Sequence, residues 1–383
     1  MNFTSEFIEE IQRNRTYLLS LLEVDNPSKL ELKLKKELLN HWHSLPIADS
    51  SIFREFSIDS SSAMRSLSRG IDFFIVRALM LGSNGFIKKK MMFDAIPGIT
   101  DSDVSSKLLR ILRDLIEIKI IVENCPNSEG NLVLIDGNLY SRYTHPMEQL
   151  NIKGREHLPL QLFEAMQKMF EICREKGIVV VGVSKSSKTR ALGNAFLDKL
   201  EYSREALDIP DFEMLYRWKR EEKGFTTPLI LGNYAFREDP RAMWEEPEKY
   251  LNRYFRDIPE NLREWGIEVI RKVPLAPAII MFHLIPEIGE QPLRIDVPVN
   301  CLGMKDRILD VLSFRFADSY IIEDLISQLI ADRGGREVYN ALLYVVDKEV
   351  RLSSNVVDKV YKSILGSELK IPIEYDRSTR RFY

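Results

Sequence analysis

The stretch NLVLIDGNLYSR, Asn131 to Arg142, decides the fold that we expect for this chain. Its apolar run, residues 132–135, predicts a buried β-strand, which stops at Asp136 before Gly137. A carboxylate therefore stands at the end of a strand, where α/β proteins place metal ligands and catalytic groups because the backbone there is rigid. The alternative is an ordinary Asp-Gly turn, and only acidic residues elsewhere in the chain can decide between the two.

The segment before this strand predicts a helix. Residues 103–123 carry leucine and isoleucine at helical spacing, and Glu117 borders the apolar face. A glutamate at such a position is usually a rim residue of a packed helix. It gains interest here because the helix leads directly into the strand that ends at Asp136.

The segment after it predicts a helix and a second strand. Residues 157–175 are helical in pattern, with Gly177 at the usual stop position, and residues 178–183 form an apolar run. This strand leads into SKSSKTR, residues 184–190, where Lys185 is the first of three cations among hydroxyls. Such a loop suits phosphate oxygens, although a solvated loop is an equal alternative. The spacing of a Walker A loop is absent.

A second acidic candidate lies upstream, in residues 53–81. Apolar and polar residues alternate up to Asp59, the serines at 60–62 predict a polar turn, and residues 71–81 predict an apolar strand. We therefore expect a hairpin with Asp59 near the end of its first strand.

The rest of the chain reads as helices with a few strands. We expect two amphipathic helices at residues 4–24 and 30–39, strands at 229–233, 278–284 and 294–298, and helices at 197–206, 305–313, 321–331 and 337–352. The last helix carries Asp347, which either lies at a polar edge or points into a site. The expected organisation is an N-terminal helical extension (1–50), one main domain (51–352), and a C-terminal helix and tail (353–383) packed on it.

Composition limits the class of protein. The 383 residues are 45% hydrophobic, which suffices for a large core, and the net charge of -3 gives no bulk attraction for nucleic acid. Cys125, Cys173 and Cys301 match no zinc spacing and suggest a reducing compartment. No leader and no membrane-spanning run is evident, so we expect a soluble cytoplasmic protein without a membrane partner.

Together, Asp59, Glu117, Asp136 and Asp347 would form a cluster of oxygen ligands if the fold gathered them. Such carboxylates repel one another unless cations neutralise them. Oxygen donors suit Mg²⁺ or Mn²⁺, whereas Zn²⁺ prefers histidine or cysteine. Two such ions about 4 Å apart can activate a water and stabilise the leaving oxygen of a phosphodiester.

The ordered set of motifs resembles the NurA nuclease family, the partners of the HerA DNA translocase. The motifs are FSIDSSSAMRSLSRG, RILRDLIEIKI, NLVLIDGNLYSR, IVVVGVSKSSKTR and RIDVP, and the resemblance spans Phe53 to Leu352. It implies an α/β, RNase H-like mixed sheet flanked by helices, with helical segments at both ends of the chain. It also implies a homodimer that degrades DNA ends with Mn²⁺ or Mg²⁺ during end resection and repair, beside a hexameric HerA-type ATPase.

The resemblance assigns roles to single residues. Asp59, Glu117 and Asp136 match the family's acidic metal ligands, Asp347 matches its late acidic or histidine position, and Lys185 falls in its Gly-Val-x-Lys segment. The first motif departs from the family pattern, because Asp59 is followed by Ser60 where the family has glycine.

We therefore expect a metal-dependent deoxyribonuclease, acting as a 5'-3' exonuclease, an endonuclease or both. The main alternative is a dimeric adaptor of the motor with weakened catalysis, which the altered Asp59 motif would favour. A phosphotransferase on the related ATPase fold would need glycine-rich phosphate loops, which the strands ending at Asp59 and Lys185 do not supply.

Overall fold

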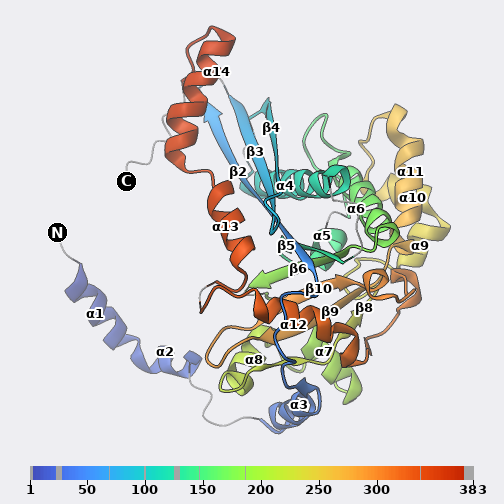
Figure 1. The fold of residues 1–383 in the computed structure, drawn as a ribbon. Coiled ribbons are helices and arrows are strands. Elements are labelled where there is room, and N and C mark those ends of the chain that lie inside the picture. Colours follow the sequence, from blue (N-terminus) through green and yellow to red (C-terminus); the bar gives the residue numbers. More distant parts are fainter. Residues whose placement is uncertain are drawn as a thin grey trace.

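The computed structural model describes residues 3–22, 28–68, 70–98, 101–124, 130–145, 147–185, 187–336 and 338–374. These residues form one mixed sheet of 11 strands, with helices on both faces (Figure 1). The strand order is β1-β7-β9-β10-β6-β5-β2-β3-β4, and β8 pairs with both β9 and β11. The strands are β1 (Trp42–His43), β2 (Arg54–Leu67), β3 (Ile71–Gly82), β4 (Ile87–Pro97), β5 (Asn131–Asp136), β6 (Val179–Lys185), β7 (Gly224–Thr226), β8 (Leu229–Leu231), β9 (Ile279–Ile285), β10 (Leu293–Pro298) and β11 (Arg315–Phe316).

The helices cover the sheet and extend the chain at both ends. In Figure 1, α1 and α2 stand apart from the sheet, whereas α13 and α14 run beside the β2–β4 strands. The α-helices are α1 (Thr4–Arg13), α2 (Arg15–Leu22), α3 (Lys29–Asn40), α4 (Ser102–Asn124), α5 (Leu139–Thr144), α6 (Leu158–Glu175), α7 (Ala191–Lys199), α8 (Asp211–Lys219), α9 (Pro240–Glu245), α10 (Pro247–Tyr254), α11 (Arg263–Lys272), α12 (Glu323–Ala331), α13 (Ala341–Val350) and α14 (Lys362–Leu369).

The centre of the sheet is parallel and is buried on both faces. β5 pairs in parallel with β2 on one side and with β6 on the other. Its residues alternate between two cores: Val133 and Ile135 pack with α4 and α6, whereas Leu132 and Leu134 pack with α12. Helices on both faces explain why this strand is a continuous apolar run instead of an alternating one.

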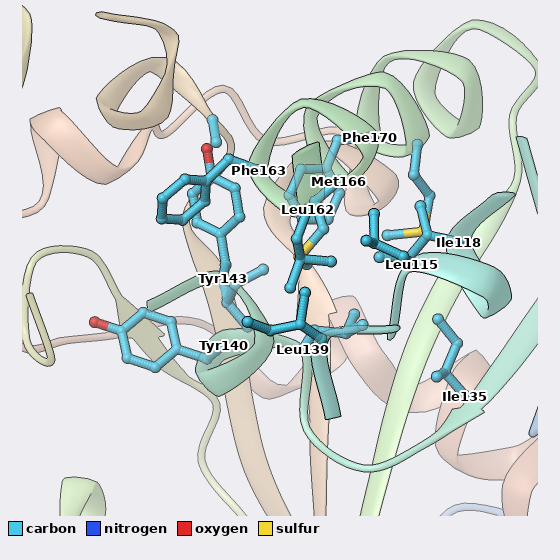
Figure 2. Close-up of a cluster of buried hydrophobic side chains, with 14 of the residues drawn as sticks. Leu115, Ile118, Ile135, Leu139, Tyr140, Tyr143, Leu162, Phe163, Met166 and Phe170 are labelled. Carbon is cyan, nitrogen blue, oxygen red and sulfur yellow. The ribbon is translucent and has the colours of Figure 1, made fainter. Parts of the chain in front are cut away.

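The core below the end of β5 fixes the turn that follows Asp136. Figure 2 shows Ile135 and Leu139 beside Leu115 of α4, with Tyr143 next to Phe163 of α6. The hydroxyl of Tyr143 also donates a hydrogen bond to the carbonyl oxygen of Val273, at 3.0 Å. Packing and a buried hydrogen bond therefore anchor the short helix α5, and with it the turn after Asp136.

The α/β class is confirmed, and so are its central elements. The predicted helices at 103–123 and 157–175 are α4 and α6, and Gly177 follows α6 with a positive φ of 63°. The predicted strands at 178–183, 278–284 and 294–298 are β6, β9 and β10. The RNase H-like assignment of the sheet is supported in part, because β2, β5 and β6 are parallel and β3 and β4 extend the sheet antiparallel.

The predicted serine turn at 60–62 is wrong. β2 runs on through these residues to Leu67, and Ser60 and Ser61 pair with Ala78 and Arg77 of β3. The serines were taken for a turn because they are polar, but their side chains find partners inside the fold. The hydroxyl oxygen of Ser61, for example, accepts a hydrogen bond from the main-chain nitrogen of Leu352. Asp59 is consequently in the middle of a strand and not near its end.

The sequence did not predict the edge strand β4, because consecutive charged residues interrupt its apolar pattern. Residues 88–90 are three lysines, which read as a solvated segment, although lysines on an edge strand are a common protection against unwanted pairing. Three helix predictions also need correction. The helix expected at 197–206 lies at 191–199, only residues 308–310 are helical within 305–313, and the first helix is divided at Asn14.

Some predictions fall outside the described residues, namely the end of the first helix at 23–24, Cys125, Ser186, Glu337 and the tail beyond residue 374. Among the helices that the structure describes, none is both long enough and apolar enough to cross a membrane.

Candidate active site

The register of two parallel strands brings Asp59 and Asp136 to the same point of the sheet. Ile58 of β2 and Ile135 of β5 are the last partners in their ladder, and each aspartate follows its isoleucine. Adjacent residues of a parallel pair point to the same face, so both carboxylates lie on the face covered by α13. The parallel ladder of β2 thus ends at Asp59, although the strand itself continues.

Burial and neighbouring charge act on Asp59. Its side chain is only 8% exposed. Burial, followed by the charges of Glu117 and Asp136, raises the pKa of Asp59 to about 7. A carboxyl group that is buried beside two other carboxyl groups is in the condition that a bound cation would relieve.

The backbone at position 60 does not require the glycine of the family's first motif. It lies in an extended strand, and it is not among the described residues with positive φ. Its hydroxyl donates a short hydrogen bond to Glu117, and its main-chain nitrogen donates one to Asp59 at 2.7 Å. The serine therefore links the two acidic residues without needing the backbone freedom of glycine.

Glu117 reaches the site from the opposite face of the sheet. It belongs to α4, and it is 1% exposed instead of lying at the rim, as its position beside an apolar stripe had suggested. One carboxylate oxygen accepts the hydroxyl of Ser60, and the other pairs with Arg142 at 2.5 Å. Burial raises the pKa of Glu117, and the charge of Arg142 opposes that shift.

Arg142 is a residue of the candidate site that the sequence did not reveal. Its guanidinium pairs with Asp114 at 2.9 Å and with Glu117, and it donates a hydrogen bond to the main-chain oxygen of Asp136 at 2.5 Å. Burial acts against its charge, but Asp114 and Glu117 raise its pKa above the ordinary value. The one available signal was its place six residues after Asp136, at the end of the motif.

Lys185 lies on the other side of Asp136. Its Nζ is 4.2 Å from the centre of the Tyr339 ring, and the hydroxyl of Tyr339 lies 3.4 Å from Oδ1 of Asp136. Burial raises the pKa of Asp136, and Lys185 exerts the strongest opposing effect. The lysine is exposed at the end of β6, so its charge is available beside the carboxylates.

Asp347 stands at the margin of this group. It is exposed on α13, while its neighbour Val346 is fully buried against Leu79 of β3. Its charge contributes to the raised pKa of Asp136, as the smallest of the causes. The fold thus brings Asp59, Glu117, Asp136 and Lys185 together and leaves Asp347 nearby without a direct contact.

The donor set fits a hard divalent cation in chemistry. Asp59 and Asp136 present oxygen atoms, which Mg²⁺ and Mn²⁺ prefer, at a place where burial raises the pKa of both carboxyl groups. Within the described ranges, however, no three His, Cys, Asp or Glu side chains are grouped closely enough to hold a metal ion. The reason lies in Glu117, which comes from the other face and is occupied by Ser60 and Arg142.

Comparisons with known proteins find one family model and several solved structures of similar fold. The family model of the NurA domain matches residues 54–352. The NurA nuclease from Sulfolobus solfataricus is similar in structure, with a TM-score of 0.58 and 17% identity over 96% of this chain and 97% of that one. A NurA bound to dAMP and manganese has a TM-score of 0.56 and 12% identity, over 96% and 98% of the two chains. No curated protein sequence matches the chain.

Proposed function

The chain belongs to the NurA family, and from that membership we propose that it is a metal-dependent DNA nuclease with an RNase H-like core. The observation that carries the proposal is the placement of Asp59 and Asp136 at one point of the sheet, where charge and burial raise the pKa of Asp59 to about 7. Solved NurA proteins with manganese, and with dAMP and manganese, support a divalent ion at such a site.

In this proposal each residue has a task. Asp59 and Asp136 would hold two ions, Mn²⁺ or Mg²⁺, with Glu117 as a further acidic ligand and Asp347 as an outer acidic group at the margin of the site. Divalent ions at such a site make a water nucleophilic at neutral pH and stabilise the leaving oxygen of a phosphodiester. Lys185, exposed beside Asp136, holds a phosphate oxygen of the substrate.

The proposal extends to partners and organisation. The substrate is a DNA end, single- or double-stranded, cut in exonuclease or endonuclease mode during end resection and repair. The protein works as a homodimer beside a hexameric HerA-type ATPase. Residues 51–352 make the nuclease domain, with helical segments 1–50 and 353–383 attached to it. These statements rest on the family resemblance.

One observation favours the alternative, a NurA-like adaptor with weakened catalysis. Glu117 has both oxygens occupied, one by Ser60 and one by Arg142, so it is not free to meet Asp59 and Asp136. An adaptor would keep this neutralised arrangement. It would show no Mn²⁺ binding that depends on its carboxylates, so the wild type and Asp136→Asn would bind Mn²⁺ equally. Calorimetric titration of Mn²⁺ into the wild type and Asp136→Asn separates the two functions.

The direct test is cleavage of labelled linear DNA by the purified protein with Mn²⁺. We expect the wild type to degrade it and Asp136→Asn to lose roughly 10³-fold or more in rate, as for a group that acts on the reacting centre. Asp324→Asn, at an exposed position of α12, is the matched control and should cleave like the wild type. Metal-dependent cleavage that survives Asp136→Asn would refute the assignment.

A further inference from the structure

A basic pocket lies beside the carboxylates, at the end of β5. Its volume is about 180 Å³, and α4, α5 and the turn after β5 line it. The charged or titratable residues at its wall are Lys107, Arg110, Arg113, Asp114, Asp136, Arg142 and His145. Lys107, Arg110 and Arg113 follow one another at three-residue spacing on α4, which places them along one side of the helix.

Two of the four cations are already neutralised within the fold. Arg142 pairs with Asp114 and Glu117, and Lys107 lies 3.2 Å from Glu148. In contrast, Arg110 and Arg113 form no ion pair with any residue that the structure describes. The pocket therefore holds two guanidinium groups without a direct ion pair, and only the longer-range charges of Asp114 and Asp59 act on them.

Arg113 also lacks a hydrogen-bond acceptor. Its Nε is buried, and none of the described residues accepts a hydrogen bond from it. A buried donor without an acceptor is costly, and more so when it carries charge, so such groups mark places where a ligand supplies the missing atom. The acceptor must be anionic to compensate a guanidinium as well.

The pocket adjoins the carboxylates that the proposed function uses. Asp136 is part of its wall, and the charge of Arg113 lowers the pKa of Asp59 against the effect of burial. Lys185, with its contact to Tyr339, lies on the other face of the sheet at the same end. Cations therefore lie on both faces of the sheet at the end of β5, where Asp136 stands.

We propose that Arg110 and Arg113 bind a phosphate of the DNA strand next to the one that is cleaved. The inference deepens the proposed function and rests on it. Guanidinium groups recognise phosphate oxygens in a bidentate manner, and a phosphate would supply an acceptor for Arg113 and a direct ion pair for both arginines. A phosphodiester within the strand and a terminal phosphomonoester share this chemistry.

The test measures DNA binding without cleavage. Fluorescence anisotropy of a labelled single strand in EDTA is recorded at several salt concentrations for the wild type, Arg110→Gln and Arg113→Gln. Each substitution should weaken binding about 10-fold and reduce the slope of log K against log[salt] by about 0.7, the contribution of one phosphate contact on a single strand. Arg113→Lys should restore the slope and only part of the affinity, because lysine keeps the charge without the fork.

Lys119→Gln is the matched control, because Lys119 is exposed on the same helix and does not line the pocket. It should change neither affinity nor slope by a comparable amount. The side chain of Arg110 forms no hydrogen bond or ion pair with the described residues, so Arg110→Gln should keep the thermal unfolding midpoint of the wild type. This variant remains informative even if Arg113→Gln unfolds.

Four DNA forms identify the phosphate: a closed circular strand and linear strands with a 5'-phosphate, with a 3'-phosphate or with neither. Equal losses for all forms point to an internal phosphodiester, and a loss confined to one phosphorylated end points to that terminal phosphate. Unchanged affinity and slope for Arg110→Gln and Arg113→Gln on every form overturn the inference, even when the wild type cleaves DNA. If the wild type does not cleave DNA with metal, but Arg110→Gln and Arg113→Gln still lose DNA affinity as expected, only the nuclease function is refuted.

Discussion

Two buried groups of charge in the same sheet have opposite character. On β10, Arg294 donates to both oxygens of Asp296, at 2.8 and 3.1 Å, and the carboxylate also accepts the main-chain nitrogen of Tyr140 at 2.9 Å. At the ends of the β2–β5 ladder, Asp59 instead faces the charges of Asp136 and Glu117. The first group is balanced by a direct ion pair, whereas Asp59 has no ion pair with any residue that the structure describes.

This difference separates a structural role from a functional one. The carboxylate of Asp296 fixes α5 against the sheet through Tyr140, and both of its oxygens are engaged within the fold. Carboxylates that are desolvated together destabilise the fold, so a protein retains them where a cation or substrate is to be bound. Substitutions in the two groups should therefore change different properties.

The largest expected effect on stability lies in the balanced pair. Asp296→Asn leaves the buried guanidinium of Arg294 without its counter-charge, so it should lower the free energy of unfolding by about 3 kcal/mol. Urea unfolding at neutral pH measures this loss. Cleavage per folded molecule should fall less than 10-fold, because Asp296 does not touch the carboxylate cluster.

A double variant sharpens this comparison. Arg294→Met with Asp296→Leu removes both charges and should recover most of the lost stability. If Asp296→Asn unfolds at the same urea concentration as the wild type, the pair does not have the structural role that its geometry indicates.

The next effect concerns the unbalanced cluster and pH. Because the pKa of Asp59 is raised to about 7, the folded protein keeps this proton after the unfolded chain has lost it. The protonated Asp59 therefore contributes its full stabilisation at pH values below the pKa of aspartate in the unfolded chain. This contribution is lost as the pH rises towards 7, the pKa in the folded protein. Between about pH 5 and pH 6.5 the difference in stability between the wild type and Asp59→Asn should change by about 2 kcal/mol, since one proton accounts for ~1.36 kcal/mol per pH unit.

Urea unfolding of both proteins without metal across this pH range provides the measurement. Taking the difference removes the contribution of other buried acids such as Glu55, whose pKa is raised to about 8. Parallel pH profiles for the two proteins would show that Asp59 does not carry the shifted proton.

The sequence predicts the parts of this site that local pattern controls. The apolar run before Asp136, the periodicity of α4 and Gly177 after α6 identify three elements, because burial on both faces and helix ends leave strong local signals. Asp59 and Asp136 could be named as candidates from their place in β-patterned segments. Their meeting depends on the register of β2 against β5, which no local pattern fixes.

The parts that could not be predicted depend on tertiary contacts. Arg142 looks like an ordinary surface residue of a short helix, and only the fold turns it toward Asp114 and Glu117. Ser60 and its neighbours resemble a turn until β3 supplies their strand partners. Long-range pairing decided both cases, and it also decided that Glu117 is buried.

The smallest effect is expected at Asp347, where the cluster meets solvent. Its carboxylate is exposed on α13 and influences Asp136 only as a minor charge, so water and salt screen most of its interaction. Asp347→Asn should thus reduce Mn²⁺-dependent cleavage by less than about 10-fold, or less than ~1.4 kcal/mol of transition-state stabilisation. Glu349→Gln, two residues along the same helix and equally exposed, is the control and should have no effect. A loss as large as that for Asp136→Asn would mean that α13 moves inward when metal and DNA bind, and that Asp347 then belongs with the unbalanced carboxylates and not with the surface.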